Sequence, residues 1–133
     1  KEAARYYKMA ADLGHSDAMY NYAIMLHNGD GVDVDKKEAA HYYKMASDLG
    51  NTNAMNNYGN MLYKGDGIEA NKKEAAQYLK MSADGGNATA MCAYGIVLYE
   101  GWGIPVNKEE ASKYLNMSAK LGNVEAINFI HGN

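Results

Sequence analysis

The chain has 133 residues and a formal net charge of -3 at pH 7, with acidic and basic side chains mixed along its length. This pattern argues against nucleic acid as a partner, because no basic stripe is present to neutralise a phosphate backbone. No long apolar run is present, which argues against membrane insertion. The single cysteine, Cys92, excludes an internal disulfide framework and a cysteine-ligated zinc site.

One segment recurs through the chain. KEAARYYKMA begins at residue 1 and returns as KEAAHYYKMA at residue 37, as KEAAQYLKMS at residue 73 and as EEASKYLNMS at residue 109, so that successive copies start 36 residues apart. A period of this length is typical of a solenoid, in which each unit buries its apolar face on its neighbour. Function is therefore expected on an extended surface.

The repeat predicts an all-α fold, an α/α superhelix built from helix-turn-helix units. We expect a single repeat array over residues 1–133. Each full repeat would contain two helices, and the three full repeats would be residues 15–50, 51–86 and 87–122. Before them, residues 1–14 would form the second helix of a repeat, and after them residues 123–133 would form part of a first helix.

The first helix of each unit, helix A, is predicted near residues 16–28, 52–64 and 88–100. Apolar side chains at spacings of three and four place one buried stripe on it. In the first copy the stripe is Ala18, Met19, Tyr22, Ala23 and Leu26. The small residue at positions 23, 59 and 95 would allow a close helix crossing.

The second helix, helix B, is predicted near residues 36–49, 72–84 and 108–121, with an earlier copy already under way at Lys1. Asp35, Asn71 and Asn107 each precede a glutamate by three residues, as in a capping box.

Each helix B is expected to end at a glycine that takes a left-handed conformation, followed by a cap for the next helix A. The glycines are Gly14, Gly50, Gly86 and Gly122, and the caps are His15, Asn51, Asn87 and Asn123. Between helices A and B lies a Gly-x-Gly loop, at residues 29–31, 65–67 and 101–103. No P-loop Lys-[Ser/Thr] follows it, which favours a structural turn over a phosphate site.

Together these residues form a pattern known from one repeat family. The first part of each unit reads Ala-x3-Tyr-[Ala/Gly]-x2-Leu-x2-Gly-x-Gly-[Val/Ile]. It is followed by Lys-Glu-Ala-Ala-x-Tyr-[Tyr/Leu]-Lys-Met-[Ala/Ser] and Gly-Asn. This pattern resembles the Sel1-like repeat, a relative of the tetratricopeptide repeat, over essentially the whole chain. One departure is that Tyr22 and Leu26 exchange the usual Leu and Tyr of the family. The resemblance implies a right-handed superhelix with A helices on the concave side, and a role as an adaptor that assembles protein complexes.

Helix A carries side chains opposite its packing stripe that change from copy to copy. Tyr and Ile there are costly to leave in water, and Asn can donate to and accept from a peptide backbone. Charges of both signs predict a short, mostly neutral extended segment or helix as the partner, a protein or peptide. The predicted partner-binding residues are Asp17, Tyr20, Ile24, His27, Asn28, Asn53, Asn56, Asn60, Tyr63, Lys64, Thr89, Cys92, Ile96, Tyr99, Glu100 and Trp102.

Other interpretations of this face stay open at this point. Tyr63 and Tyr99 could instead pack against the next repeat. Trp102, the only tryptophan, could cover the end of its helix pair or anchor a ligand at the groove rim. Methionines that recur on both helices, such as Met19 and Met81, are interpreted as packing between repeats.

No catalytic or metal-binding pattern emerges. The four histidines fall at different positions of the repeat, and the acidic residues from Asp30 to Asp35 lack the glycine and distal glutamate of an EF-hand. We therefore predict a non-catalytic module without cofactors or metal. The alternatives are a substrate-selecting region of a larger enzyme, of the kinase or ubiquitin-ligase type, and more remotely a β-lactamase-like activity associated with cysteine-rich relatives.

The lone cysteine favours a reducing compartment, and a cytoplasmic location is expected. Two Asn-x-Ser/Thr triplets, at residues 87–89 and 116–118, keep a secretory compartment open. Apolar side chains in the last half-repeat, Ile127, Phe129 and Ile130, suggest end-to-end self-association.

Overall fold

The computed structural model describes residues 2–132, and its regular elements there are all helices. In chain order they are α1 (Glu2–Asp12), α2 (Ser16–Asn28), α3 (Lys36–Asp48), α4 (Thr52–Lys64), α5 (Lys72–Asp84), α6 (Ala88–Glu100), α7 (Lys108–Lys120) and α8 (Val124–Ile130).

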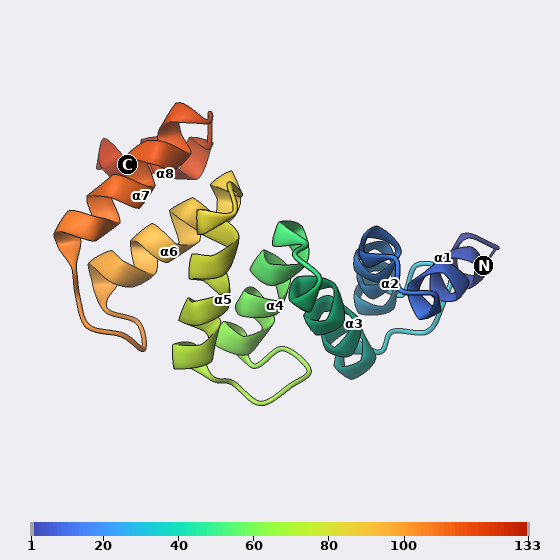
Figure 1. Ribbon diagram of the computed structural model, residues 1–133. Helices are drawn as coiled ribbons and strands as arrows, with labels where there is room; N and C mark the ends of the chain where they lie inside the picture. Colours follow the sequence, from blue (N-terminus) through green and yellow to red (C-terminus); the bar gives the residue numbers. More distant parts are fainter. Residues whose placement is uncertain (1, 133) are drawn as a thin grey trace.

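The helices follow one another along a curved array whose two ends lie far apart (Figure 1). Each helix packs on the next one in the chain. In the terms used for the repeat, α2, α4, α6 and α8 are the A helices, and α1, α3, α5 and α7 are the B helices. The predicted all-α repeat superhelix is confirmed. The A helices of the three full repeats have the predicted bounds, and α3 and α7 end one residue before the predicted position.

Pairing of A with B depends on a close crossing at one small residue. A Cβ atom on Gly95 would lie 2.7 Å from Cγ of Leu115, and one on Gly59 would lie 3.1 Å from Leu79. Ala23 occupies the same position in the first repeat and is fully buried. The small side chain therefore sets how near the two helices approach, as the sequence predicts.

A second contact recurs in each hairpin, between a tyrosine of helix A and one of helix B. Tyr22 meets Tyr42 edge to face with ring centroids 5.0 Å apart, and Tyr94 meets Tyr114 in the same way at 5.0 Å. Such pairs contribute about 0.5–1.5 kcal/mol beyond the area they bury. The exchange of Tyr and Leu relative to the family pattern is thus accommodated by aromatic pairing within the hairpin.

Helix ends form as the capping residues predict, with one exception. Asp35, Asn71 and Asn107 each accept a hydrogen bond from the backbone N–H three residues on, at 3.0 Å. Asn51 caps α4 in the same manner. The predicted cap at His15 is wrong, because its side chain makes no capping hydrogen bond to α2.

Helices A and B of one repeat are joined by polar contacts as well as by apolar packing. The hydroxyl of Ser82 donates to the backbone carbonyl of Thr52, and Ser118 donates to that of Ala88, each at 2.7 Å. Both serines are buried, so these bonds satisfy side chains that would otherwise be costly to bury.

The two methionine rows behave differently. On the A helices Met19 and Met91 are buried, as predicted. On the B helices Met81 and Met117 are 47% and 39% exposed, so their predicted packing between repeats is wrong. Buried residues of α5 such as Leu79 and Ser82 lie on another side of the helix from Met81. Met45, the copy on α3, is partly buried against the core, so the recurring methionine does not have the same environment in every repeat.

None of the helices within residues 2–132 combines the length and hydropathy that a membrane span needs.

In the second and third full repeats, the Gly-x-Gly loop packs against the start of the preceding helix B. At Gly103, with φ +83°, a Cβ atom would lie 2.7 Å from Cβ of Lys72 and 3.0 Å from its backbone carbon. Gly67 meets Lys36 in the same way one repeat earlier. This approach requires both a left-handed backbone and the absence of a side chain.

Replacing Gly103 by Ala should therefore destabilise the array more than replacing Gly122. Both glycines have positive φ (+83° and +91°), so both variants incur about 1–2 kcal/mol of backbone strain. Only Gly103→Ala adds a clash with the preceding repeat, which should cost about 1–3 kcal/mol more. Urea denaturation followed by circular dichroism measures the difference. Equal loss of stability in the two variants would show that the loop is not held against Lys72.

Candidate functional site

A cleft opens between two neighbouring A helices, α2 and α4. It has a volume of about 370 Å³ and is lined by Ile24, His27, Asn28, Tyr43, Asn57, Asn60, Met61, Lys64 and Asp66. The first three residues come from α2, Tyr43 from α3, the next four from α4, and Asp66 from the loop that follows α4.

Apolar side chains form the deepest part of the cleft. Tyr43 and Met61 are each 4% exposed, and Ile24 is half-buried beside them. Burial raises the pKa of the Tyr43 hydroxyl, while a hydrogen bond with Asn57 acts in the opposite direction. Asn60 lies one helical turn from both Asn57 and Lys64, so amides, an apolar floor and a cation are combined in one cleft.

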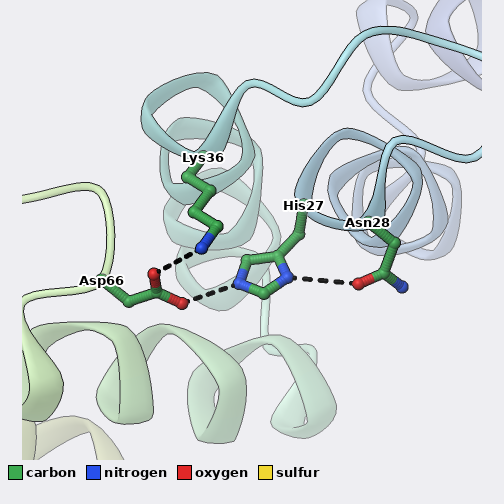
Figure 2. A network of polar contacts seen from close by, with 4 residues as sticks. All are labelled: His27, Asn28, Lys36 and Asp66. Carbon is green, nitrogen blue, oxygen red and sulfur yellow. Dashed lines mark hydrogen bonds and ion pairs between the residues drawn. The ribbon is translucent and has the colours of Figure 1, made fainter.

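A network of polar side chains crosses one end of the cleft and links the first two repeats (Figure 2). Nε2 of His27 donates to Oδ2 of Asp66 at 2.9 Å, and Nζ of Lys36 donates to Oδ1 of the same carboxylate at 2.9 Å. Nδ1 of His27 lies 3.3 Å from Oδ1 of Asn28. Three elements, α2, α3 and the loop after α4, thus meet at Asp66.

These contacts lower the pKa of Asp66. The largest cause is the hydrogen bond from His27, followed by that from Lys36. The carboxylate therefore stays ionised to lower pH than an isolated aspartate, and both of its oxygens are occupied within the protein.

The same three positions carry different chemistry at the next interface. His27, Lys36 and Asp66 correspond, one period later, to Tyr63, Lys72 and Trp102. Trp102 stacks on Tyr63 with ring centroids 5.5 Å apart and an interplanar angle of 27°, and Nζ of Lys72 lies 5.2 Å from the centre of the Tyr63 ring. An ion pair is thus replaced by aromatic stacking and a cation–π contact.

At the third interface, Tyr99 meets Phe129 edge to face at 5.3 Å and lies 4.9 Å from Nζ of Lys108. The alternative interpretation of Tyr63 and Tyr99, that they pack against the next repeat, is therefore confirmed. Trp102 packs on the preceding repeat rather than over the end of its own helix pair, and it remains 39% exposed.

Five of the predicted partner-binding residues line the cleft. We call the surface formed by these five residues and the other accessible predicted positions the A-helix face. The five residues are Ile24, His27, Asn28, Asn60 and Lys64.

Two predicted residues do not lie on an accessible surface. Asn56 is 7% exposed and Cys92 is 1% exposed, and Cys92 packs with Leu115 and Ala126. The prediction that these two residues are accessible to a partner is therefore wrong. Tyr20 holds the same repeat position and packs on Tyr43, with centroids 6.0 Å apart, so this position turns toward the neighbouring B helix.

Burial at this position leaves one polar atom without a partner. Oδ1 of Asn56 accepts no hydrogen bond within the described part of the chain. A buried unsatisfied carbonyl costs about 1–3 kcal/mol. The change from Tyr to Asn to Cys at this position therefore reflects differences in local packing, and it does not indicate a partner-binding surface.

Two more predicted residues hold the array together. The capping residue Asn51 donates from its side chain to Oδ1 of Asp17 at 3.2 Å, and Asn87 donates to Oδ1 of Asn53 at 2.8 Å. Asp17 and Asn53 therefore connect successive A helices at their N-terminal ends.

The remaining predicted residues are partly or fully accessible. Thr89, Glu100 and Tyr99 are exposed, and Ile96 is half-buried beside Phe129. In the last half-repeat Ile130 is 42% exposed. End-to-end self-association through this region stays a prediction.

Four residues of the cleft were not predicted: Tyr43, Asn57, Met61 and Asp66. Tyr43 and Met61 fit the apolar core pattern, which gives no sign that they also floor a cleft. Asp66 had a usable signal, because it shares a loop position with Trp102.

No group of three His, Cys, Asp or Glu side chains gathers into a metal-binding arrangement within residues 2–132. Burial raises the pKa of the Cys92 thiol to about 11, which makes it a poor nucleophile near neutral pH. The arrangement at the α2–α4 cleft is suited to binding through amides, apolar contact and charge.

Comparison with known families matches the Sel1 repeat at residues 1–15, 16–51, 52–87 and 88–123. The chain belongs to the Sel1 repeat family. Sel1 repeats generally bind proteins and generally act as non-catalytic scaffolds, so the fold is that of a protein-interaction module. A search of curated proteins found no match to the sequence.

Solved structures of Sel1 repeat proteins share the fold. The chain is 28% identical to a Sel1 repeat protein from Oxalobacter formigenes, with a TM-score of 0.88 over 96% of this chain and 52% of that one. It is also 28% identical to c5321, a protective antigen present in uropathogenic Escherichia coli strains that displays an SLR fold, with a TM-score of 0.91 over 95% of this chain and 27% of that one.

A third structure, cysteine rich protein B of Helicobacter pylori, has a TM-score of 0.76 at 21% identity, over 96% of this chain and 92% of that one. At this identity the likeness concerns the fold alone. The present chain spans about half of the Oxalobacter formigenes protein and about a quarter of c5321.

Replacing Asp66 by Asn should lower the melting temperature at neutral pH, because His27 and Lys36 lose their charged acceptor. The folded-state pKa of Asp66 is depressed, so its stabilisation is present above the unfolded-state pKa of about 3.9 and is lost as pH falls through the folded-state value. Melting curves of variant and wild type, recorded from pH 7 down to pH 2, should converge in the acid range.

The matched control is Asp30→Asn, at the same loop position of the first repeat. Asp30 makes none of the ion pairs found within residues 2–132. Its replacement should leave the melting temperature nearly unchanged. A pH-independent loss in Asp66→Asn would contradict the assigned ion pairs.

Cys92 should resist thiol reagents in the folded protein. At pH 8 a pKa of about 11 reduces its thiolate fraction by a factor of about 100 relative to an ordinary cysteine, and burial blocks access as well. Reaction with Ellman's reagent before and after urea unfolding measures this. A Thr89→Cys, Cys92→Ser double variant, with its thiol on the exposed side of α6, should react at once. Equally fast reaction of folded wild type would mean that Cys92 is accessible.

Proposed function

We propose that this chain is a non-catalytic interaction module that holds a segment of a partner protein along its A-helix face, seated in the cleft between α2 and α4. The observation that supports it best is the composition of that cleft. Side-chain amides of Asn57 and Asn60 stand above a floor of Tyr43 and Met61, and Lys64 lies at the rim.

An amide can donate to a peptide carbonyl and accept from a peptide N–H, which suits a ligand whose backbone hydrogen bonds are unmet. An apolar floor rewards burial of one side chain at about 25 cal/mol per Å². Since the helices that carry these groups are already ordered by their neighbours, the module itself loses little conformational entropy on binding.

The B-helix surface offers a contrast. Its ion pairs Lys44–Asp48 and Lys80–Asp84 join residues four positions apart on one exposed helix, at 3.5 and 2.8 Å. Pairs of this kind contribute only a few tenths of a kcal/mol and keep the surface soluble. We propose no partner for that side.

The selection of substrates by a larger parent protein is a separate hypothesis from peptide binding by this chain. The first two relatives extend well beyond the part that this chain matches. The hypothesis that the array selects substrates for a kinase or ubiquitin ligase concerns such a parent, and it would use the same A-helix face.

Peptide binding tests the proposal directly. A phage-displayed library of random 12-residue peptides is panned on the wild-type chain, and selected peptides are synthesised and titrated by fluorescence anisotropy. Asn60→Ile should weaken their binding at least about tenfold, because it removes the amide from the centre of the cleft. The fold should tolerate this change, since Ile24 and Ile96 occupy the same position in the other repeats.

Gln77→Ala, on the exposed face of α5, is the matched control and should bind as wild type does. Both variants should melt within a few degrees of wild type, because surface changes stay within about 0.5 kcal/mol. If no peptide is enriched, or if Asn60→Ile binds selected peptides as tightly as wild type, the cleft is not the binding site.

A further inference from the structure

The A-helix face presents two different chemistries to a partner segment, one in the α2–α4 cleft and one at Trp102. This inference rests on the proposed function and extends it from the place of binding to the kind of ligand. It follows from comparing the α2–α4 cleft with the equivalent positions one repeat later.

Charge in the α2–α4 cleft is not balanced. The only carboxylate that lines it, Asp66, is already bound by His27 and Lys36. Lys64 also lines the cleft, and it forms no ion pair with any residue within 2–132. An acidic side chain of a ligand would therefore find a free cation, with the amides of Asn57 and Asn60 beside it as further donors.

Three polar positions of this cleft are occupied by apolar or aromatic residues at the next interface. Asn57 and Asn60 of α4 correspond to Ala93 and Ile96 of α6, and Asp66 corresponds to Trp102. The stack of Trp102 on Tyr63 leaves the indole 39% exposed. Lys72 lies against the Tyr63 ring and so helps to hold this stack in place.

A large aromatic ring that is held in place and only partly covered is a strong anchor for an apolar side chain. Tryptophan occurs once in the chain, at the loop position that holds Asp30 and Asp66 in the other repeats. The module folds with either residue there, so this tryptophan is not a requirement of the repeat.

Spacing between the two features follows from helix packing. Neighbouring helices lie about 10 Å apart, and an extended chain advances about 3.3 Å per residue. A ligand that lies across α4 would therefore pass from the cleft to the indole within about three residues.

We propose that the bound segment is an extended peptide with an acidic side chain in the α2–α4 cleft, beside Lys64, and an apolar side chain about three residues away against Trp102.

Peptides selected by phage display on the wild-type chain serve as the ligands for the test. They should share an Asp or Glu separated by two to four positions from a Leu, Ile, Phe or Tyr. Because Trp102 is the only tryptophan, its emission reports the second contact directly, and tryptophan-free peptides should shift or quench it on binding.

Two variants that other repeats already accommodate separate the contacts. Lys64→Glu copies Glu100 and should weaken binding at least about tenfold, and a peptide whose acidic residue is changed to Lys should recover most of this loss on that variant. Trp102→Asp copies Asp66 and should weaken wild-type peptides about tenfold or more, while Val106→Ala, at an exposed site in the same loop, should not.

The results distinguish this inference from the proposed function. Peptides that lose affinity for Asn60→Ile but leave Trp102 emission unchanged, and bind Trp102→Asp as well as wild type, would overturn the two-part ligand and leave the binding site in place. Selected peptides without the acidic residue, or without recovery on Lys64→Glu, would overturn it as well. Failure to enrich any peptide would overturn both proposals.

Discussion

The close approach of the second and third Gly-x-Gly loops to the start of the preceding helix B is the contact on which the A-helix face depends. Gly67 lies against Lys36 and Gly103 against Lys72, with no room for a side chain between them. This contact joins the loop of one hairpin to helix B of the hairpin before it. It also brings the residue before the second glycine, Asp66 or Trp102, against the end of the preceding helix A. A backbone requirement thus decides which side chains meet at the rim of the A-helix face.

Once that geometry is set, the chemistry at the rim can change without disturbing the stack. The first interface uses a carboxylate bound by His27 and Lys36, and the second uses Trp102 stacked on Tyr63. Lysine at the start of helix B serves in both, as an ion-pair donor in one and as a cation beside a ring in the other. Each contact is partly exposed and modest in energy, because water screens it. What differs greatly is the surface that the two interfaces present to a partner.

At the variable and methionine positions, sequence-based prediction failed for one reason. Variation at Tyr20, Asn56 and Cys92 was interpreted as freedom from packing, yet the last two are buried. Recurrence of Met81 was interpreted as packing, yet it is about half exposed. Comparing the copies shows which residues occupy the same position of the repeat. It does not show whether a neighbouring helix covers the side chain at that position. Asp17 and Asn53 show the same limit, because their hydrogen bonds reach a cap 34 residues away.

The sequence by itself determined the helices, their caps and the all-α repeat fold, because these follow from local periodicity and from glycine and asparagine at defined positions. It also indicated the A-helix face, and five of its predicted residues line one cleft. Only the tertiary structure decided that Tyr43, Asn57 and Asp66 complete that cleft and that Trp102 reaches back to Tyr63. Those contacts join residues 14 to 39 positions apart, and their partners are chosen by the angle at which one hairpin settles on the next.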